Sequence, residues 1–144
     1  MKCYNILIMK RLILILLILL IFLPTLSCSN SAQDYINKGY EHILDEDYEA
    51  ALKDFNKAIE IDPRNVEAYN NRGIVLGILG NHYGAIQDFN MAIDLKPTDS
   101  EAYKSRGVSK LYLQQKESGC LDLAKSEQMG FPGTTELIEE FCGR

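Results

Sequence analysis

Residues 66–99 read VEAYNNRGIVLGILGNHYGAIQDFNMAIDLKPTD, and much of this stretch repeats the residues that precede it. Seven residues of the preceding stretch are identical to the residues that stand 34 positions later. They are Ala51, Asp54, Phe55, Asn56, Ala58, Ile59 and Pro63, which return as Ala85, Asp88, Phe89, Asn90, Ala92, Ile93 and Pro97. So many identities at one offset indicate an internal repeat, and a period of this length is typical of stacked helical units.

The same offset continues on both sides of this stretch. It relates three tyrosines and three glycines, which are Tyr35, Tyr69 and Tyr103, and Gly39, Gly73 and Gly107. The chain therefore divides into three successive units at residues 32–65, 66–99 and 100–133, followed by residues 134–144. Repeat arrays need a terminal element over their last apolar face, so the final segment is expected to be a short capping helix.

Each unit is predicted to form two helices joined by a turn. Apolar and small residues recur at helical spacing in both halves, as with Tyr69 and Gly73 in one half and Ala85 and Phe89 in the other. Turn-forming residues at 45–47 and 80–82 separate the halves. Proline cannot continue a helix, so Pro63 and Pro97 are expected to end the second helix of their units.

The repeated glycines indicate close packing between the two helices of a unit. Glycine inside a helix costs about 1 kcal/mol relative to alanine, so its return at residues 39, 73 and 107 requires a compensating reason. We expect another helix to pass too closely there for a side chain. Ala51 and Ala85 are expected to face the glycines, and Phe55 and Phe89 to fill the remaining space.

This pattern resembles the tetratricopeptide repeat, a 34-residue helix-turn-helix unit. The first unit carries the motif as Tyr35, Gly39, Ala51, Phe55, Ala58 and Pro63, and the second as Tyr69, Gly73, Ala85, Phe89, Ala92 and Pro97. The third begins with Tyr103 and Gly107 but departs afterwards, with Gly119, Leu123 and Ser126 at the motif positions and Pro132 displaced. The resemblance implies an all-α fold of three tandem repeats in a short right-handed solenoid.

The resemblance also implies a binding surface. Members of this family bind peptides or partner helices on the concave face formed by the first helix of each repeat. Transferred to this chain, the partner-binding groove would contain Ile36, Tyr40, Asn70, Ile74, Lys104 and Val108. A protein or peptide segment is therefore the expected partner.

One subclass of the family holds a C-terminal carboxylate with basic and amide side chains, and this chain departs from that pattern. Ile36 and Tyr40 stand where a lysine and an asparagine are expected, while Glu101 and Ser105 replace basic residues. Lys38, Arg72 and Arg106 form a separate basic row at the 34-residue offset. Such a row either meets an acidic partner or is paired within the molecule.

The N-terminus is organised like an export signal. Three basic residues precede twelve unbroken apolar residues at 12–23, and the chain turns polar after Pro24. Twelve helical residues extend about 18 Å, whereas a membrane-spanning helix must cross about 30 Å of hydrocarbon. A signal peptide at residues 1–27 is therefore favoured over a single-pass N-terminal membrane anchor.

The end of this signal resembles that of a bacterial lipoprotein. Leu26, Ser27 and Cys28 match the lipoprotein signal, while Thr25 departs from the usual leucine. The resemblance implies lipid attachment at Cys28, a polar tether at residues 28–31, and a protein held at the membrane of a bacterial cell envelope. Ordinary signal cleavage remains an alternative.

Charge and motif content argue against several other functions. The chain has a net charge of −5, which becomes −8 when the three basic residues of the signal are removed. An acidic protein without a basic stripe is not expected to bind nucleic acid. His42 and His82 are the only histidines and lie outside any spaced ligand set, and His82 is expected in a turn. No metal, cofactor, small-molecule substrate or catalytic activity is expected.

Two cysteines remain in the predicted folded part. Cys3 leaves with the signal and Cys28 is assigned to lipid, so Cys120 and Cys142 form an even pair in an oxidising compartment. A disulfide between them is predicted, with two buried free thiols as the alternative. Two functions remain open, a membrane-tethered module for protein–protein interaction and a structural component of an envelope assembly that associates with itself.

Overall fold

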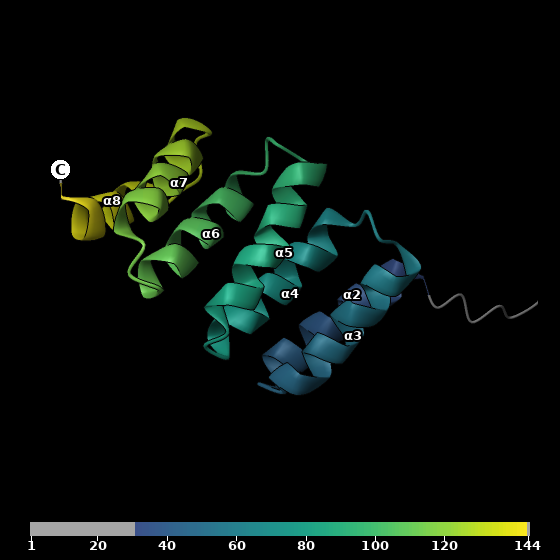
Figure 1. Ribbon diagram of the computed structural model, residues 1–144. Helices are drawn as coiled ribbons and strands as arrows, with labels where there is room; N and C mark the ends of the chain where they lie inside the picture. The colour runs from purple at the N-terminus through teal and green to yellow at the C-terminus, as the bar shows by residue number, and fades with distance from the viewer. Residues whose placement is uncertain (1–30, 144) are drawn as a thin grey trace, which may run out of the picture.

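The computed structural model describes residues 31–143 and contains only helices and turns in that range. The described residues form seven helices, drawn in Figure 1: α2 (Ala32–Leu44), α3 (Tyr48–Ile61), α4 (Val66–Ile78), α5 (His82–Leu95), α6 (Ser100–Tyr112), α7 (Lys116–Gln128) and α8 (Thr134–Cys142). The first helices of the units begin at residues 32, 66 and 100, which reproduces the 34-residue period. The predicted all-α repeat fold is confirmed.

The polar residues before the helices determine where most of them begin. Side chains of Ser31, Asp47, Asn65, Asn81 and Asp99 each accept a hydrogen bond from a backbone amide in the first turn of the following helix. These bonds satisfy amides that have no partner within the helix. His82 is the first residue of α5, so its predicted place in a turn is wrong. Asn81, one residue earlier, is the cap.

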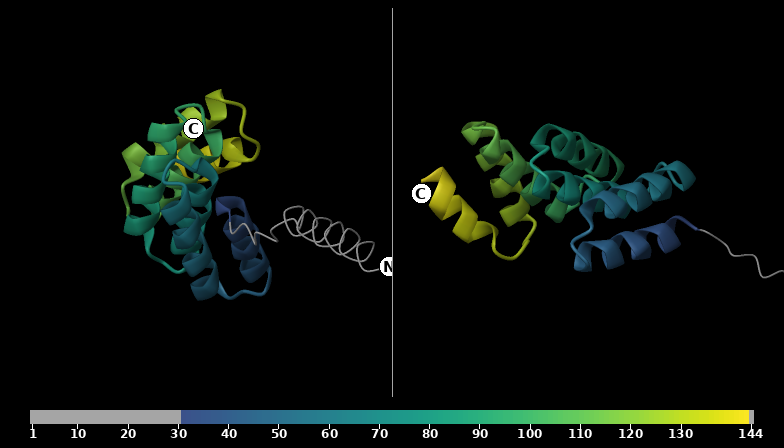
Figure 2. Two further views of the ribbon diagram at one scale, coloured as in Figure 1. Left: turned by 90° about the vertical axis from the view of Figure 1, so that its right-hand side faces the viewer. Right: turned by 90° about the horizontal axis from the view of Figure 1, so that it is seen from below.

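The helices pack as consecutive pairs along one direction. α2 packs on α3, α4 on α5 and α6 on α7, and α3 and α5 contact the first helix of the next pair. Figure 1 shows the pairs side by side in chain order, and the right-hand view of Figure 2 places α2 and α8 toward different ends of the array. α8 packs against α7, in agreement with the predicted capping helix.

Close packing within the pairs explains the repeated glycines. A Cβ atom added to Gly39 would lie 2.5 Å from the ring of Phe55, and one added to Gly73 would lie 2.7 Å from the ring of Phe89. The close neighbour is thus the aromatic ring and not the alanine that we expected. Phe55 is completely buried and Phe89 nearly so, which makes these rings the centre of their pairs.

The turn between the two helices of each pair has one backbone conformation. Glu46, Gly80 and Gln114 lie 34 residues apart and all have positive φ, at 58°, 79° and 60°. This left-handed conformation is ordinary for glycine and less favourable for the other two residues. The three helix pairs therefore share one turn geometry, although only the second pair has glycine at this position.

A covalent bond joins the third pair to the capping helix. Cys120 of α7 and Cys142 of α8 form a disulfide, and their Cα atoms lie 5.8 Å apart. The predicted pairing is therefore present in the structure. It joins the capping helix to the last repeat, where the motif residues are missing.

Candidate functional site

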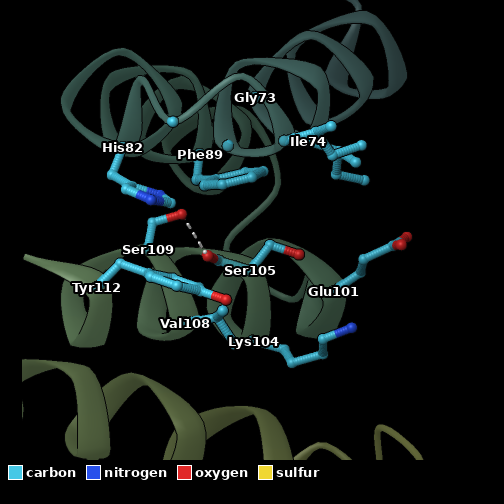
Figure 3. Close-up of a pocket in the computed structure, with 13 residues that line it drawn as sticks. Gly73, Ile74, His82, Phe89, Glu101, Lys104, Ser105, Val108, Ser109 and Tyr112 are labelled. Atoms are coloured by element: carbon cyan, nitrogen blue, oxygen red, sulfur yellow. Dashed lines mark hydrogen bonds between the residues drawn. The ribbon is translucent and has the colours of Figure 1, made fainter. Parts of the chain in front are cut away.

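A groove follows the first helices of the second and third repeats. One pocket of about 500 Å³ lies between α4 and α6 and is lined chiefly by Ile74, Ile78, Val108 and Tyr112. A second pocket, of about 630 Å³, also has Val108 and Tyr112 in its wall. Because these two residues belong to both pockets, we treat the pockets as one surface and call it the apolar groove. Figure 3 shows its first part, with side chains from both sides of the space.

The apolar groove exposes side chains that a folded protein normally covers. Ile78 is 52% exposed and Tyr112 is 69% exposed. Leu44 occupies the equivalent place in α2 and is 84% exposed. These three residues are spaced by 34 positions, so the array presents a regular row of large apolar groups. Ile78 and Tyr112 line the same pocket, and contiguous exposed apolar surface marks binding sites.

Two stacked aromatic rings are part of the lining of the groove. The rings of His82 and Tyr112 are nearly parallel, with centroids 4.5 Å apart. Nδ1 of His82 is buried and has no hydrogen-bond partner among residues 31–143. Figure 3 shows His82 and Tyr112 approaching each other from the two sides of the pocket. The stacking holds the Tyr112 ring in place while most of its surface stays open to a ligand.

The capping helix completes the second part of the groove. Leu137 and Phe141 lie one helical turn apart on α8 and face Val108, Leu111 and Tyr112 across the pocket. Phe141 is 44% exposed. The disulfide at Cys142, the residue after Phe141, ties this wall to α7. The capping helix therefore both covers the last repeat and extends the groove.

A smaller and more polar pocket adjoins the apolar groove. It has a volume of about 240 Å³ and is lined by Tyr40, Val66, Glu67, Asn70, Asn71, Lys96, Asp99 and Glu101. We call it the acidic pocket. The Tyr40 hydroxyl donates to Glu67 at 3.2 Å and accepts from Nδ2 of Asn71 at 2.8 Å. Burial raises the pKa of Tyr40, and the carboxylates of Glu67 and Glu101 raise it further.

The predicted groove residues are divided between these pockets. Ile74, Lys104 and Val108 line the apolar groove, and Tyr40 and Asn70 line the acidic pocket. Ile36 does not reach either surface, because its side chain is completely buried in the core formed by α2, α3 and α4. Its assignment as a groove residue is therefore wrong. The apolar side chain of Ile36, in the first repeat, packs in the core and does not contact solvent.

Two members of the basic row, Arg72 and Arg106, are paired within the molecule, whereas the Lys38 amine lies over the Tyr35 ring. Arg72 binds both carboxylate oxygens of Asp88, at 2.8 and 2.6 Å, and Arg106 binds Asp122 at the same distances. Both arginines also donate to an asparagine of the preceding repeat, Asn56 and Asn90 respectively. Hydrogen bonding to the aspartates raises the pKa of both arginines. Their side chains are thus occupied by bonds to an aspartate of their own repeat and to an asparagine of the preceding repeat.

Several residues of the site were not selected from the sequence. Ile78 and Tyr112 are not among these, because the 34-residue offset aligns them and the repeat pattern indicates both as first-helix surface positions. Leu137 and Phe141 carry only a weak signal, an apolar pair at helical spacing in a segment outside the repeat. His82 joins the groove by stacking on a residue 30 positions away, which no local pattern indicates.

Some predictions concern residues that the structure does not describe. Cys28, the signal and most of the polar tether precede residue 31 and lie outside the described residues. Within residues 31–143, no helix is both long and apolar enough to cross a membrane. The same part of the chain has no group of three or more His, Cys, Asp or Glu residues placed to hold a metal ion.

Comparison with known families identifies the repeats. A model described as TPR repeat matches residues 39–80, and one described as tetratricopeptide repeat matches residues 66–99. The chain thus contains tetratricopeptide repeats, as its motif residues indicate. No curated protein matches the sequence significantly.

Solved structures of similar fold are tetratricopeptide repeat domains. The first such domain of Spaghetti (RPAP3), bound to the HSP90 peptide SRMEEVD, is 23% identical with a TM-score of 0.76, covering 79% of this chain and 92% of that chain. The Sgt2 domain from Aspergillus fumigatus is 18% identical with a TM-score of 0.74, covering 77% and 76%. The second domain of human RPAP3, in complex with the HSP70 peptide SGPTIEEVD, is 19% identical with a TM-score of 0.73, covering 78% and 96%. At these identities the likeness shows the fold alone.

Proposed function

We propose that this protein is a binding module that holds a segment of a partner protein in its apolar groove. The observation that carries the proposal is the continuous groove of Ile78, Tyr112 and Phe141, whose side chains are large, apolar and 44–69% exposed. Apolar pockets with a few polar groups are the usual form of a recognition site. The concave face of a repeat array also suits an extended or helical segment.

The partner differs from the acidic peptides named for the RPAP3 domains. Glu67 and Glu101 line the acidic pocket beside the groove, and Tyr40 stands at a position where the carboxylate-binding subclass has an amide. An acidic peptide end would meet like charge there, which disfavours binding. A short groove of this kind is expected to bind with micromolar affinity, which corresponds to about −8 kcal/mol.

The module is proposed to act at the surface of a membrane. The export-like N-terminus and Cys28 support a lipid anchor that follows signal cleavage, with the repeats held outside the cytoplasm of a bacterial cell. Mass spectrometry of the mature protein tests this anchor. A start at Cys28 with an added lipid mass is expected, and an unmodified Cys28 or a start elsewhere contradicts the anchor.

Site-specific crosslinking tests the groove. A photoreactive phenylalanine in place of Tyr112 in the full chain is expected to yield a discrete adduct with a partner in the native membrane. The same substitution at Tyr83, which is 67% exposed on α5 and lines none of the three pockets, serves as the control. Equal adducts from both positions would argue against the groove.

A double variant tests the predicted polar contacts. Tyr40→Ala combined with Lys104→Glu is expected to weaken capture of the crosslinked partner while the helical circular dichroism spectrum stays unchanged. Undiminished capture by the folded double variant contradicts a role for these residues.

A structural role is the second candidate function. Tyr83 and Leu121 expose 67% and 72% of their surface on second helices, outside the groove. Such residues suit contacts between copies of the chain in an envelope assembly. Sedimentation of the full protein over a range of concentrations separates the two functions. Association that is lost in a Tyr83→Ser/Leu121→Ser variant favours assembly, whereas a monomer at high concentration favours the binding module.

A further inference from the structure

The acidic pocket holds more negative charge than its own cations neutralise. Three carboxylates line it, from Glu67, Asp99 and Glu101, together with the single amine of Lys96. Nζ of Lys96 lies 3.3 Å from Oδ2 of Asp99. Among the residues that the structure describes, neither Glu67 nor Glu101 has a cationic partner. The pocket therefore has two carboxylates available to a ligand.

A buried amide in the same pocket lacks a hydrogen-bond donor. Asn70 is 7% exposed, and its Oδ1 atom has no partner within residues 31–143. Its neighbours Tyr40 and Asn71 are bonded to each other, and Tyr40 also reaches Glu67, so none of them supplies the missing donor. A buried acceptor without a donor is costly to a folded protein. A donor that enters from outside would remove this cost.

We infer that the acidic pocket receives a lysine or arginine side chain of the bound segment, held between Glu67 and Glu101 and donating a hydrogen bond to Asn70. The inference rests on the proposed binding function and names the chemistry of its partner. Ionised donors form the stronger hydrogen bonds to carboxylates. The three groups together match the positive charge and the donor capacity of such a side chain.

The position of the pocket explains why a protein segment is the occupant, and not a free cation. Glu101 lines the acidic pocket and the apolar groove together. A chain that places a basic side chain beside Glu101 can continue along α6 over Val108 and Tyr112. The bound segment thus has one basic residue followed by apolar residues, and its charge is opposite to that of the EEVD-ended peptides named in the related structures.

A peptide selection tests the inference. The probe is a library of random twelve-residue peptides displayed on phage, selected on the full chain in mild detergent. Enrichment of peptides that combine lysine or arginine with neighbouring apolar residues is expected. Replacing the basic residue of a selected synthetic peptide by norleucine should weaken binding about tenfold, which corresponds to about 1.4 kcal/mol. Raising the salt concentration should weaken the basic peptide more than the norleucine peptide.

Variants of the acidic pocket test whether its carboxylates cause the preference for the basic peptide. Glu67→Gln/Glu101→Gln should remove the tenfold preference, so that the basic peptide and the norleucine peptide bind this variant with equal affinity. The control Glu49→Gln/Glu139→Gln makes the same charge change at exposed residues outside all three pockets and should keep the preference. Asn70→Leu should weaken the basic peptide without lowering the melting temperature, because the unpartnered carbonyl is removed.

The outcomes separate this inference from the proposed function. Selected peptides that are apolar without a basic residue, or that carry acidic residues, overturn the inference while the binding function stands. Equal loss of preference in the control variant also overturns it. Selection of basic residues without apolar neighbours, with spermidine competing fully, assigns the pocket to a free cation and overturns it as well. Failure to enrich any peptide counts against the proposed function itself.

Discussion

The second and third repeats fill the space between their two helices in different ways. In the second repeat, the ring of Phe89 occupies the space beside Gly73, and an added Cβ would lie 2.7 Å from that ring. In the third, Leu123 and Gly119 replace the aromatic and the alanine. A Cβ added to Gly107 would therefore lie 2.9 Å from the carbonyl oxygen of Gly119, so backbone meets backbone.

The two repeats also differ in what secures their second helix. α5 is preceded by Asn81, whose side chain accepts from the amide of Gly84 at 3.0 Å, whereas Gln115, the residue before α7, makes no side-chain cap bond. The disulfide of Cys120 belongs to α7. The comparison teaches that a repeat can lose its aromatic residue and its cap when closer backbones and a covalent bond take their place.

Removing the central side chain of each repeat is expected to give the largest effects. Phe89→Ala should lower the free energy of unfolding by about 4 kcal/mol, and Leu123→Ala by about 3 kcal/mol, because both are buried and the second removes fewer atoms. Urea denaturation followed by circular dichroism measures both. Tyr83→Ala, at an exposed site, should change stability by less than about 0.5 kcal/mol. A larger loss for Leu123→Ala would contradict the view that the second repeat depends more on its ring.

The disulfide is expected to contribute about 3 kcal/mol, since it closes a loop with a sequence separation of 22. Cys120→Ser/Cys142→Ser should lower the melting temperature, and hydrogen exchange should increase first in α8. Reduction of the unaltered protein by a phosphine is the matched comparison and should have the same effect. If exchange rose equally in α4 and α5, the bond would stabilise the whole array and not the third repeat.

Gly73 and Gly77, both on α4, differ in what an added side chain would contact. Gly73→Ala should destabilise by about 2 kcal/mol, because its Cβ would press on a buried ring. Gly77→Ala should stabilise by about 1 kcal/mol, since an added Cβ meets no atom within 4 Å and alanine favours the helix. Both changes are measured by thermal unfolding. Similar losses at the two sites would show that glycine acts there through backbone geometry and not through the ring.

The arginines that join the repeats are expected to differ as well. Among residues 31–143, Asp88 has one cationic partner, Arg72, whereas Asp122 has both Arg106 and Lys110, at 2.6 and 2.7 Å. Arg72→Met should therefore cost about 2 kcal/mol, because it leaves a buried carboxylate unpaired, and Arg106→Met only about 1 kcal/mol. Adding Lys110→Met to Arg106→Met should restore the larger loss. Equal costs for the two single variants in denaturation experiments would contradict this role of Lys110.

The sequence predicted the repeat architecture well because the residues that define the helices recur along the chain. The tyrosine and glycine positions return in all three units, and the alanine and aromatic positions in the first two, so the first helix of a unit is indicated three times and the second helix twice. The contacts that lie between units were harder to predict. The burial of Ile36 depends on three helices coming together, and the stacking of His82 on Tyr112 depends on a contact between repeats. No single unit contains the information for either.

The binding surface was predicted only in part, for a similar reason. Family positions identified Ile74 and Val108, because equivalent residues of the first helices share one face. Those positions gave no information on α8, which lies outside the repeat and supplies Leu137 and Phe141. The disulfide could be predicted from counting cysteines, but its consequence for the groove needed the position of the helix that it holds.

The smallest expected effect compares the beginnings of α2 and α4 at low pH. Ser31 and Asp34 bond reciprocally at the start of α2, at 2.8 and 3.2 Å. In α4, Ala68 stands at the place of Asp34, and the capping residue before the helix is the uncharged Asn65. The backbone hydrogen bond from Ser31 lowers the pKa of Asp34 below its ordinary value of 3.8. A lowered pKa in the folded state means that the stabilisation is complete above about pH 3.8 and is lost as the pH falls through the lower, folded-state value. Hydrogen exchange in the first turn of α2 should therefore quicken in that acidic range relative to the first turn of α4, and Asp34→Asn should abolish the difference in pH dependence. An NMR titration that places the carboxyl of Asp34 at or above 3.8 would show that this cap does not distinguish the first repeat from the second.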